Sequence, residues 1–354
     1  MSIMDRSTNT DEIDDVIIMR GILAKARKKL YFTQFGRKDE FKARSGNTVR
    51  WYSASTLAAQ TSTINDSPTL RNSEISFTPI EKTLSMYGND LTYVEALDLT
   101  SVCDIPGQTR EEMAYNAGLS IDTVVRDTLL ASEDTSGIDH LFANDSTAVT
   151  IDANDIAKYD DIIDVATELE EAGVPRVEHP KSGLGVYIAI VTPRMKSKWL
   201  KDTNFRAAIN LGQPEKAWYG ELGIIDNVCF VISDNSADYT YNGVTCQKAF
   251  VTGKDSYGVA ALPEYTGMSA SAPAATVSQM DNEIWTADQV NRMFKLVLTP
   301  AGDGKGNGAH GDEYAVKTTI AWKAYFAHTL LVTAHAKVYV AAKGATLSAG
   351  SSSS

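Results

Sequence analysis

Cysteine is scarce in this sequence. Its three cysteines, Cys103, Cys229 and Cys246, are scattered over 354 residues, and no CxxC pair occurs. So few cysteines at such spacing exclude a disulfide framework and a cysteine metal site. We expect all three to be small buried apolar residues of a protein made in a reducing compartment such as a cytoplasm.

Long apolar runs are also absent. The most apolar long segment, residues 319–342, is interrupted by Lys323, His328, His335 and Lys337. The opening residues 1–15 are polar and acidic and lack the apolar core of a secretory leader. We therefore expect neither a signal peptide nor a membrane span.

Positive charge is in the minority, with 33 Lys and Arg against 45 Asp and Glu and a formal net charge of -12. This excludes a protein that binds nucleic acid over its whole surface, because phosphate contacts need clustered cations. The charge is uneven, however. Residues 20–50 hold ten basic and two acidic residues, 10 - 2 = +8, which leaves -12 - 8 = -20 for the rest.

The basic N-terminal arm therefore precedes an acidic body, and its densest part contains Lys25, Arg27, Lys28 and Lys29. One interpretation is a solvated helix face, because residues 16–30 have the apolar spacing of a short amphipathic helix. The other is a contact with an acidic neighbouring subunit or with nucleic acid.

Recognisable catalytic and metal-binding patterns are missing. The glycine-rich residues 301–312 lack the GxxxxGK[ST] spacing of a phosphate-binding loop, because Lys305 is followed by glycine. His328 and His335 belong to no HExxH pattern, and no GxSxG occurs. We predict no catalytic residue, no metal ligand and no cofactor, although a single sequence does not reveal a site assembled from distant residues.

Residues 45–94 alternate like β-strands around a segment, residues 53–73, in which nine of 21 residues are Ser or Thr. This pattern predicts a long, thin hairpin, which has no core of its own and is marginally stable in water. We expect its apolar residues Trp51, Ile75 and Phe77 to be buried only against something else. The alternative is an ordinary meander within a domain.

Apolar spacing predicts one long helix after Pro106, of about 20 residues and roughly 30 Å, with Thr109 and Glu112 as a capping box. Its apolar positions recur every four residues. A second helix is predicted over residues 155–173, then a strand from Leu184, then a helix that begins with Thr192 and Pro193.

The C-terminal third returns to strands, at residues 227–235, 246–253 and in the apolar run 319–342. Residues 266–276 and 301–312 are rich in small residues and are predicted to be exposed loops. The last residues, GATLSAGSSSS, are predicted to be disordered.

This order of elements resembles the Hong Kong 97-type capsid fold of tailed bacteriophages, and the N-four-type major capsid family in particular. The resemblance extends over roughly residues 46–342. Four segments carry it: the polar stretch around Asp66 to Pro68 that leads into ISFTPIEKTLSMYGNDLTYV, then TPRMKSKWLKDTNFRAAIN, WYGELGIIDNVCFVISDN and IAWKAYFAHTLL. Within them the family motif residues are Gly220, Glu221, Gly223, Trp322 and Lys323.

The resemblance implies an α+β fold divided into an N-terminal arm, an extended hairpin loop, a spine helix, a peripheral domain and an axial domain. On this basis residues 1–45 form the arm, 46–94 the extended hairpin loop, 95–150 the peripheral domain with the spine helix, 151–265 mainly the axial domain, 266–342 a return to the peripheral and axial sheets, and 343–354 a disordered tail.

The function implied is that of a structural protein, not an enzyme: a virion capsid protein whose hexamers and pentamers form an icosahedral shell around double-stranded DNA. The candidate assembly contacts are Lys25, Arg27, Lys28, Lys29, Trp51, Ile75 and Phe77. A separate scaffolding protein, a portal and decoration proteins are the other partners implied, with assembly in the host bacterial cytoplasm and no membrane.

Two alternatives stay open at this point: the shell of a cellular nanocompartment with the same fold, and an α+β enzyme with a composite site. No lysine lies between Arg50 and Lys82, so the isopeptide cross-linking of some relatives is not carried over. Residues 301–312 look like an insertion before the segment that contains Trp322.

Overall fold

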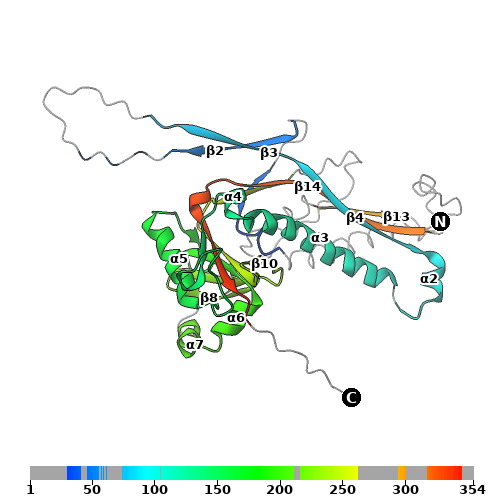
Figure 1. Cartoon of the computed structure of the whole chain (residues 1–354). Coiled ribbons are helices and arrows are strands. Elements are labelled where there is room, and N and C mark those ends of the chain that lie inside the picture. The colour runs from blue at the N-terminus through cyan, green and yellow to red at the C-terminus, as the bar shows by residue number, and fades with distance from the viewer. Residues whose placement is uncertain are drawn as a thin grey trace, which may run out of the picture.

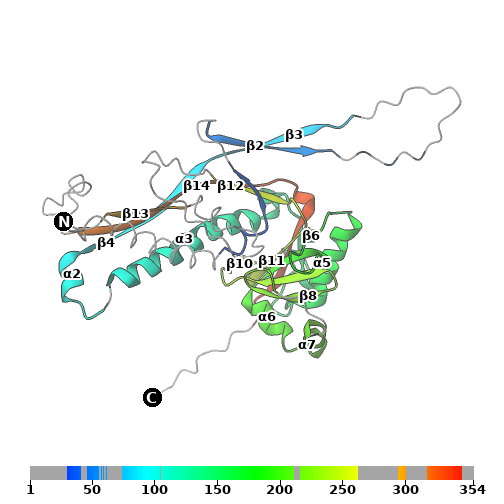
Figure 2. The same ribbon diagram turned by 180° about the vertical axis from the view of Figure 1, so that it is seen from behind.

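The described part of the chain is a computed structural model of residues 30–40, 46–55, 57, 59, 61, 74–103, 105–210, 216–261, 294–299 and 317–344. Figures 1 and 2 show a two-stranded ribbon, an elongated platform that contains one long helix, and an α/β body. The predicted amphipathic helix before Leu30, the small-residue loops and the C-terminal tail lie outside the described residues.

The long helix is α3 (Ile105–Leu129), which we call the spine helix. Its buried residues recur every four positions, as predicted: Met113, Ala117, Ile121, Val125 and Leu129. The predicted capping box is wrong, because the Thr109 hydroxyl donates to the Ile105 carbonyl inside the helix at 2.8 Å. The helix begins earlier because Pro106 is tolerated in a first turn, where its missing N–H has no intrahelical partner.

The platform is a five-stranded sheet built around one long strand, β14 (Lys317–Leu330). The strand β4 (Ser85–Val94) pairs with it along one edge, and β12 (Tyr257–Ala261) and β13 (Phe294–Thr299) pair along the other. The short strand β1 (Arg37–Glu40) lies parallel to β12. Burial alternates along most of β14, which packs one face of the strand toward the spine helix. A short helix, α2 (Glu95–Thr100), follows β4.

The ribbon consists of β2 (Thr48–Ala54) and β3 (Phe77–Thr83), paired antiparallel with Trp51 opposite Ile80. It projects away from the rest of the molecule (Figure 1). The predicted hairpin is thus confirmed at its base, whereas most of residues 56–73 lie outside the described part.

The body is an eight-stranded sheet. Its main path runs β5 (His140–Phe142), β15 (Ala336–Ala342), β11 (Val244–Thr252), β7 (Gly185–Val191), β9 (Val228–Ile232) and β8 (Glu221–Ile225). Two short strands join it from the side, β10 (Asp238–Tyr241) on β11 and β6 (Val177–Glu178) on β7. The strands predicted from residues 184, 227 and 246 are confirmed as β7, β9 and β11.

Each face of the body sheet closes its own apolar core. On one face, alternate residues such as Ile188 and Phe250 pack against the spine helix and the platform. On the other face lie α5 (Tyr159–Glu171), α6 (Pro193–Trp199) and α7 (Thr203–Asn210). Three single-turn helices complete the described part: α4 (Glu133–Ser136) and the 3-10 helices Ala143–Asp145 and Thr333–His335.

The observed ends of α5 and α6 can be compared with the ends predicted from their capping residues. Thr192 caps α6 as predicted, with its hydroxyl accepting from the Met195 N–H at 3.3 Å. Helix α5 ends before Gly173, whose φ of 69° suits glycine. It begins at Tyr159 rather than at residue 155, because Ile156 forms a β-bridge with Ala342 instead.

Two other predictions are tested by burial and helix length. Cys229 and Cys246 are buried, and burial raises the pKa of both thiols. Cys103 is exposed, contrary to expectation, because it follows α2 at the edge of the platform.

Within the described residues, no helix has the length and apolarity that a membrane span requires.

Candidate assembly surfaces and the spine junction

The two faces of the ribbon differ in what they contact. The inner face packs Val49 and Trp51 against Ala260 and Ala327 of the platform, and Trp51 is only 4% exposed. The Trp51 indole also donates to Asp39 Oδ2 at 2.6 Å. The expectation that Trp51 leaves water only in a shell is therefore wrong, because its own subunit already buries it.

The outer face of the ribbon has no such cover. Tyr52, Ile75 and Phe77 are 58%, 52% and 65% exposed, and we call them the outer stripe. Strand register places them on one side, because Tyr52 faces Pro79 and Phe77 faces Ala54 in the same alternating set. An ion pair between Arg50 and Glu81 continues this side toward the platform. The structure thus places Ile75 and Phe77, as predicted candidates, on an exposed apolar surface.

The N-terminal arm enters the molecule through residues 30–36, which we call the arm root. Leu30, Phe32 and Thr33 are buried, and the Tyr257 hydroxyl donates to the Phe32 carbonyl. The rings of Phe35 and Trp218 meet edge to face, 5.2 Å between centroids. The arm root is therefore part of the subunit core. The four arm residues proposed as contacts, Lys25, Arg27, Lys28 and Lys29, lie outside the described residues.

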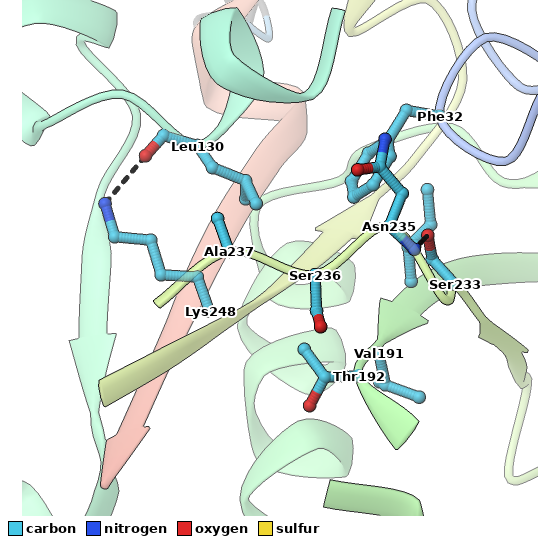
Figure 3. A pocket seen from close by; sticks show the side chains of 10 residues that line it. Phe32, Leu130, Val191, Thr192, Ser233, Asn235, Ser236, Ala237 and Lys248 are labelled. Atoms are coloured by element: carbon cyan, nitrogen blue, oxygen red, sulfur yellow. Dashed lines mark hydrogen bonds between the residues drawn. The ribbon is translucent and has the colours of Figure 1, made fainter. Parts of the chain in front are cut away.

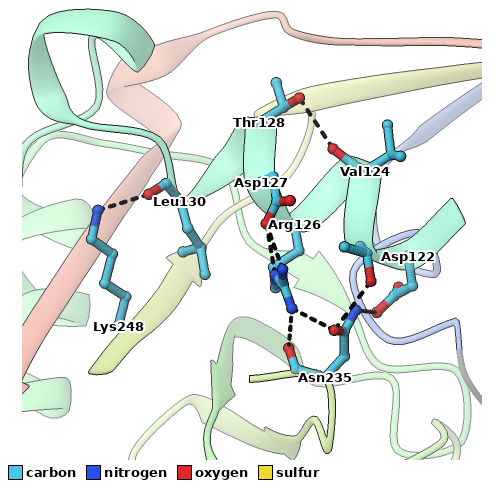
Figure 4. Close-up of polar contacts among 9 residues, drawn as sticks. Asp122, Val124, Arg126, Asp127, Thr128, Leu130, Asn235 and Lys248 are labelled. Carbon is cyan, nitrogen blue, oxygen red and sulfur yellow. Dashed lines mark hydrogen bonds and ion pairs between the residues drawn. The ribbon is translucent and has the colours of Figure 1, made fainter. Parts of the chain in front are cut away.

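One buried carboxylate of the spine helix holds both the arm root and the body. Asp122 Oδ1 accepts hydrogen bonds from the N–H groups of Phe32 and Thr33, at 2.7 and 3.3 Å. Its Oδ2 accepts from the Asn235 amide at 3.0 Å (Figure 4). Burial raises the pKa of Asp122 to about 7, although the three donors and nearby Arg126 oppose the shift.

Arg126, one turn further along the spine helix, continues this junction. Its guanidinium donates to Asn235 Oδ1 at 2.5 Å and to Asp127 Oδ1 at 2.6 Å. Because Asn235 accepts from Arg126 and donates to Asp122, its side-chain orientation is fixed. The loop between β9 and β10 is thereby held against two successive turns of the spine helix.

A second contact joins the C-terminal end of the spine helix to the body sheet. Lys248 of β11 donates to the Leu130 carbonyl at 2.7 Å, and its Nζ lies 4.3 Å from the centre of the Tyr239 ring. A cation at the end of a helix satisfies carbonyls that lack intrahelical partners. Burial lowers the pKa of Lys248 to about 8.

Lys248 and Asn235 border a small hollow between the spine helix and the body sheet, with Phe32, Leu130 and Thr192 on its walls (Figure 3). The hollow has about the room that one buried water requires. It is therefore a packing gap at the junction and does not have the dimensions of a substrate pocket.

The motif at Gly220 and Glu221 forms a tight turn into β8. Gly220 has a φ of 77°, and a Cβ there would lie 2.5 Å from the Ile232 carbonyl oxygen, so only glycine fits. Glu221 Oε2 accepts from the N–H groups of Ala217 and Trp218 at 2.7 and 3.1 Å. The carboxylate thus completes the turn that it follows.

Gly223 and a buried histidine complete this region. Strand pairing between β8 and β9 shifts register between Glu221 and Gly223, a β-bulge that glycine accommodates. The His179 Nε2 lies 3.4 Å from Glu221 Oε1, and its ring meets the Trp218 ring edge to face. Because both side chains are fully buried, this pair supports the turn and is not accessible to a substrate.

Trp322 and Lys323 lie in the middle of β14. The Trp322 indole donates to Asn116 Oδ1 of the spine helix at 2.9 Å, and the Asn89 amide of β4 donates to the same oxygen at 3.2 Å. Trp322 therefore links three elements of the platform. Lys323 is half-buried and lies opposite Gly88.

Two histidines, the buried His328 and the half-buried His140, are expected to make the subunit less stable in acid. Burial lowers the pKa of His328 and of His140 to about 4, with Lys82 and Lys248 acting in the same direction. Between about pH 4 and the unfolded value near 6.5, the folded subunit binds fewer protons than the unfolded chain, so stability falls as pH falls through this window. Between pH 7 and pH 5, the free energy of unfolding should therefore decrease less in His328→Gln than in the wild type. Denaturant titrations with parallel pH dependence in both proteins would contradict this expectation.

Among the residues that the structure describes, no three His, Cys, Asp or Glu side chains gather as metal ligands would. No protein-family model matches the chain, and no curated protein matches it in sequence.

Solved structures do match. The chain is similar to the capsid of Ralstonia phage GP4, with 12% identity, a TM-score of 0.64, and 91% of this chain and 93% of that one covered. It is similar to the capsid of cyanophage Pam1, with 11% identity, a TM-score of 0.60, and 88% and 89% covered. It is also similar to the head structure of Helicobacter pylori bacteriophage KHP40, with 10% identity, a TM-score of 0.56, and 90% and 91% covered.

These likenesses extend over nearly the whole of each chain. The predicted α+β architecture is confirmed, and the chain has the Hong Kong 97-type fold of tailed-phage major capsid proteins.

Proposed function

We propose that this chain is the major capsid protein of a tailed bacteriophage and that many copies assemble into an icosahedral head shell around double-stranded DNA. The observation that carries the proposal is the outer stripe of the ribbon, considered together with the fold. Tyr52, Ile75 and Phe77 are exposed on a two-stranded ribbon that projects from its subunit. A neighbouring subunit would remove this apolar surface from water.

The proposed partners follow from this role. Copies of the chain form hexamers and pentamers, which close the shell, and the DNA lies on its inner face. A separate scaffolding protein, a portal and decoration proteins complete the particle, which is assembled in the bacterial cytoplasm and becomes the virion capsid. No catalytic activity is part of the proposal.

Electron microscopy of the purified chain tests the proposal against both alternatives. We expect closed shells, with nucleic acid inside those recovered from infected cells. Shells that hold an enzyme cargo instead of nucleic acid would favour the nanocompartment. A chain that stays a monomer or dimer by light scattering at every concentration, and that a small molecule stabilises, would favour an enzyme and overturn the proposal.

The charge of the N-terminal arm gives a separate prediction. Changing Lys25, Arg27, Lys28 and Lys29 to Gln should weaken assembly or genome retention, and raised salt should mimic the defect, because exposed charges are screened within about 8–10 Å at physiological ionic strength. Particle yield and DNA content measure the two effects. Loss of empty shells would indicate a subunit contact, and loss of filled heads alone would indicate a genome contact. If neither particle responds, the arm is a solvated surface.

A further inference from the structure

The outward face of α5 is acidic along its whole length. The helix contains six acidic residues and no basic residue, a charge of -6. Asp160, Asp164, Glu168 and Glu171 are exposed and recur at spacings of three or four, so they lie on one face, which we call the acidic stripe. The opposite face, with Ile162, Val165 and Leu169, is buried on the body sheet.

The stability of the helix does not explain this stripe. Acidic residues in a first turn are favourable, but the carbonyl end of a helix carries partial negative charge and favours cations. Helix α5 nevertheless has Glu170 and Glu171 in its last turn and no basic residue there. Arg176 pairs with Glu170 and Lys337 with Glu168. Within the described part of the chain, Asp164 and Glu171 take part in no ion pair.

The neighbouring segment of the body has the opposite charge. Residues 193–206, which span α6 and the first turn of α7, contain five basic residues and one acidic residue, 5 - 1 = +4. Lys201 and Arg206 are exposed, and Lys196 and Lys198 are half-buried. We call these four residues the basic segment.

The two charged surfaces lie in the same helical layer, and the N-terminal end of α5 is adjacent to α7, where the Tyr159 and Phe205 rings are 5.3 Å apart. Helix α5 packs on β15 and β11, whereas α7 contacts β8 at the far edge of the body sheet. In both views of the molecule α5 lies above α6 and α7 (Figures 1 and 2). One subunit therefore presents an acidic surface and a basic surface on different elements of the same layer.

We propose that the acidic stripe of one subunit contacts the basic segment of a second copy, and that this head-to-tail contact closes the rings of subunits in the shell. The inference rests on the proposed function and adds the surface that joins the bodies of neighbouring subunits. Two different surfaces of one chain that fit each other form a heterologous interface, which generates a closed ring when the rotation closes. Opposite charges on the two surfaces also exclude the head-to-head pairing of identical surfaces, because like charges repel.

The test cancels the charge of each surface separately, from -4 to 0 on the acidic stripe and from +4 to 0 on the basic segment. The first variant carries Asp164→Lys and Glu171→Lys, and the second carries Lys201→Glu and Arg206→Glu. All four positions are exposed, and Lys at 171 and Glu at 206 suit the helix ends where they lie. Both variants should therefore melt within about 3 °C of the wild type. A control with Glu112→Lys and Glu178→Lys makes the same charge change as the first variant elsewhere on the surface.

We expect each variant alone to form at least about tenfold fewer shells than the wild type, because the attraction between opposite charges is then lost at every contact. The control should assemble normally.

The proposal is overturned if either variant assembles like the wild type. Wild-type shells in the same experiment show that such a result rejects the charged contact alone and leaves the proposed function standing. Failure of the wild type to form shells would instead reject the function.

Discussion

Deletion of residues 53–73 is expected to abolish shell formation while leaving a folded, soluble subunit. The segment removed includes the end of β2, and its described residues contribute nothing to the two cores of the body sheet. Circular dichroism should show an unchanged melting transition of the body, and electron micrographs should show no particles. Normal particles from the deleted chain would reject the ribbon as an assembly element.

Point substitutions on the two faces of the ribbon separate assembly from folding. Tyr52→Ser with Phe77→Ser removes apolar groups that are exposed in the subunit, so its stability should stay within about 0.5 kcal/mol while shells are lost. Trp51→Ala removes a buried side chain of the inner face and should cost about 3–5 kcal/mol of subunit stability. Equal effects of the two changes on stability would contradict the assignment of the faces.

Asp122→Ala is expected to lower the free energy of unfolding of the subunit by about 3–5 kcal/mol. The substitution leaves the N–H groups of Phe32 and Thr33 and the amide of Asn235 without their acceptor in a buried site. Urea titration below the assembly concentration measures the loss. A loss under about 0.5 kcal/mol, the size of a surface effect, would show that the junction contributes little.

Asp122→Asn is the matched control, because the asparagine side chain keeps the shape of aspartate and one acceptor oxygen but does not ionise. The folded pKa of Asp122 is about 7 and the unfolded value is near 3.9, so the folded subunit retains a proton that the unfolded chain loses between them. This contribution is complete below about pH 4 and is lost as pH rises through 7. The advantage of the wild type over Asp122→Asn should therefore be larger at pH 5 than at pH 8, and an equal advantage at both would contradict the shifted pKa. Arg126 and Tyr257 are the ionisable groups that interact electrostatically with the carboxylate among the described residues.

Local signals in the sequence predicted the regular elements well. The apolar repeat through Ile121 and Val125 predicted the spine helix, and Thr192 with Pro193 predicted the start of α6, because both signals depend on neighbours within one turn. The predicted start of the spine helix was wrong because the spacing of a capping box, here Thr109 and Glu112, also occurs inside helices. Residues 155–158 have helical spacing, but tertiary pairing of Ile156 with Ala342 overrides it.

The junction was not predicted, because its groups lie far apart in the chain. Asp122 is 90 residues from Phe32 and 113 from Asn235. The one available signal was an acidic residue directly after Ile121, beside the buried stripe of an otherwise regular helix. Burial of Trp51 was missed for the same reason, since the platform residues that cover it, Ala260 and Ala327, come more than 200 positions later.

The platform sheet has a consequence for how the chain is made. Its strand β1 pairs with β12, and β4 pairs with β14. Strands from the first third of the sequence can therefore pair only after the last third has been synthesised. Ribosomes add about 5–20 residues per second, and contacts between distant residues slow folding. The spine helix can form early, but the core that covers it cannot close until β14 has emerged. The subunit therefore folds as one unit after most of its synthesis is complete, and the nascent chain is the form most exposed to aggregation.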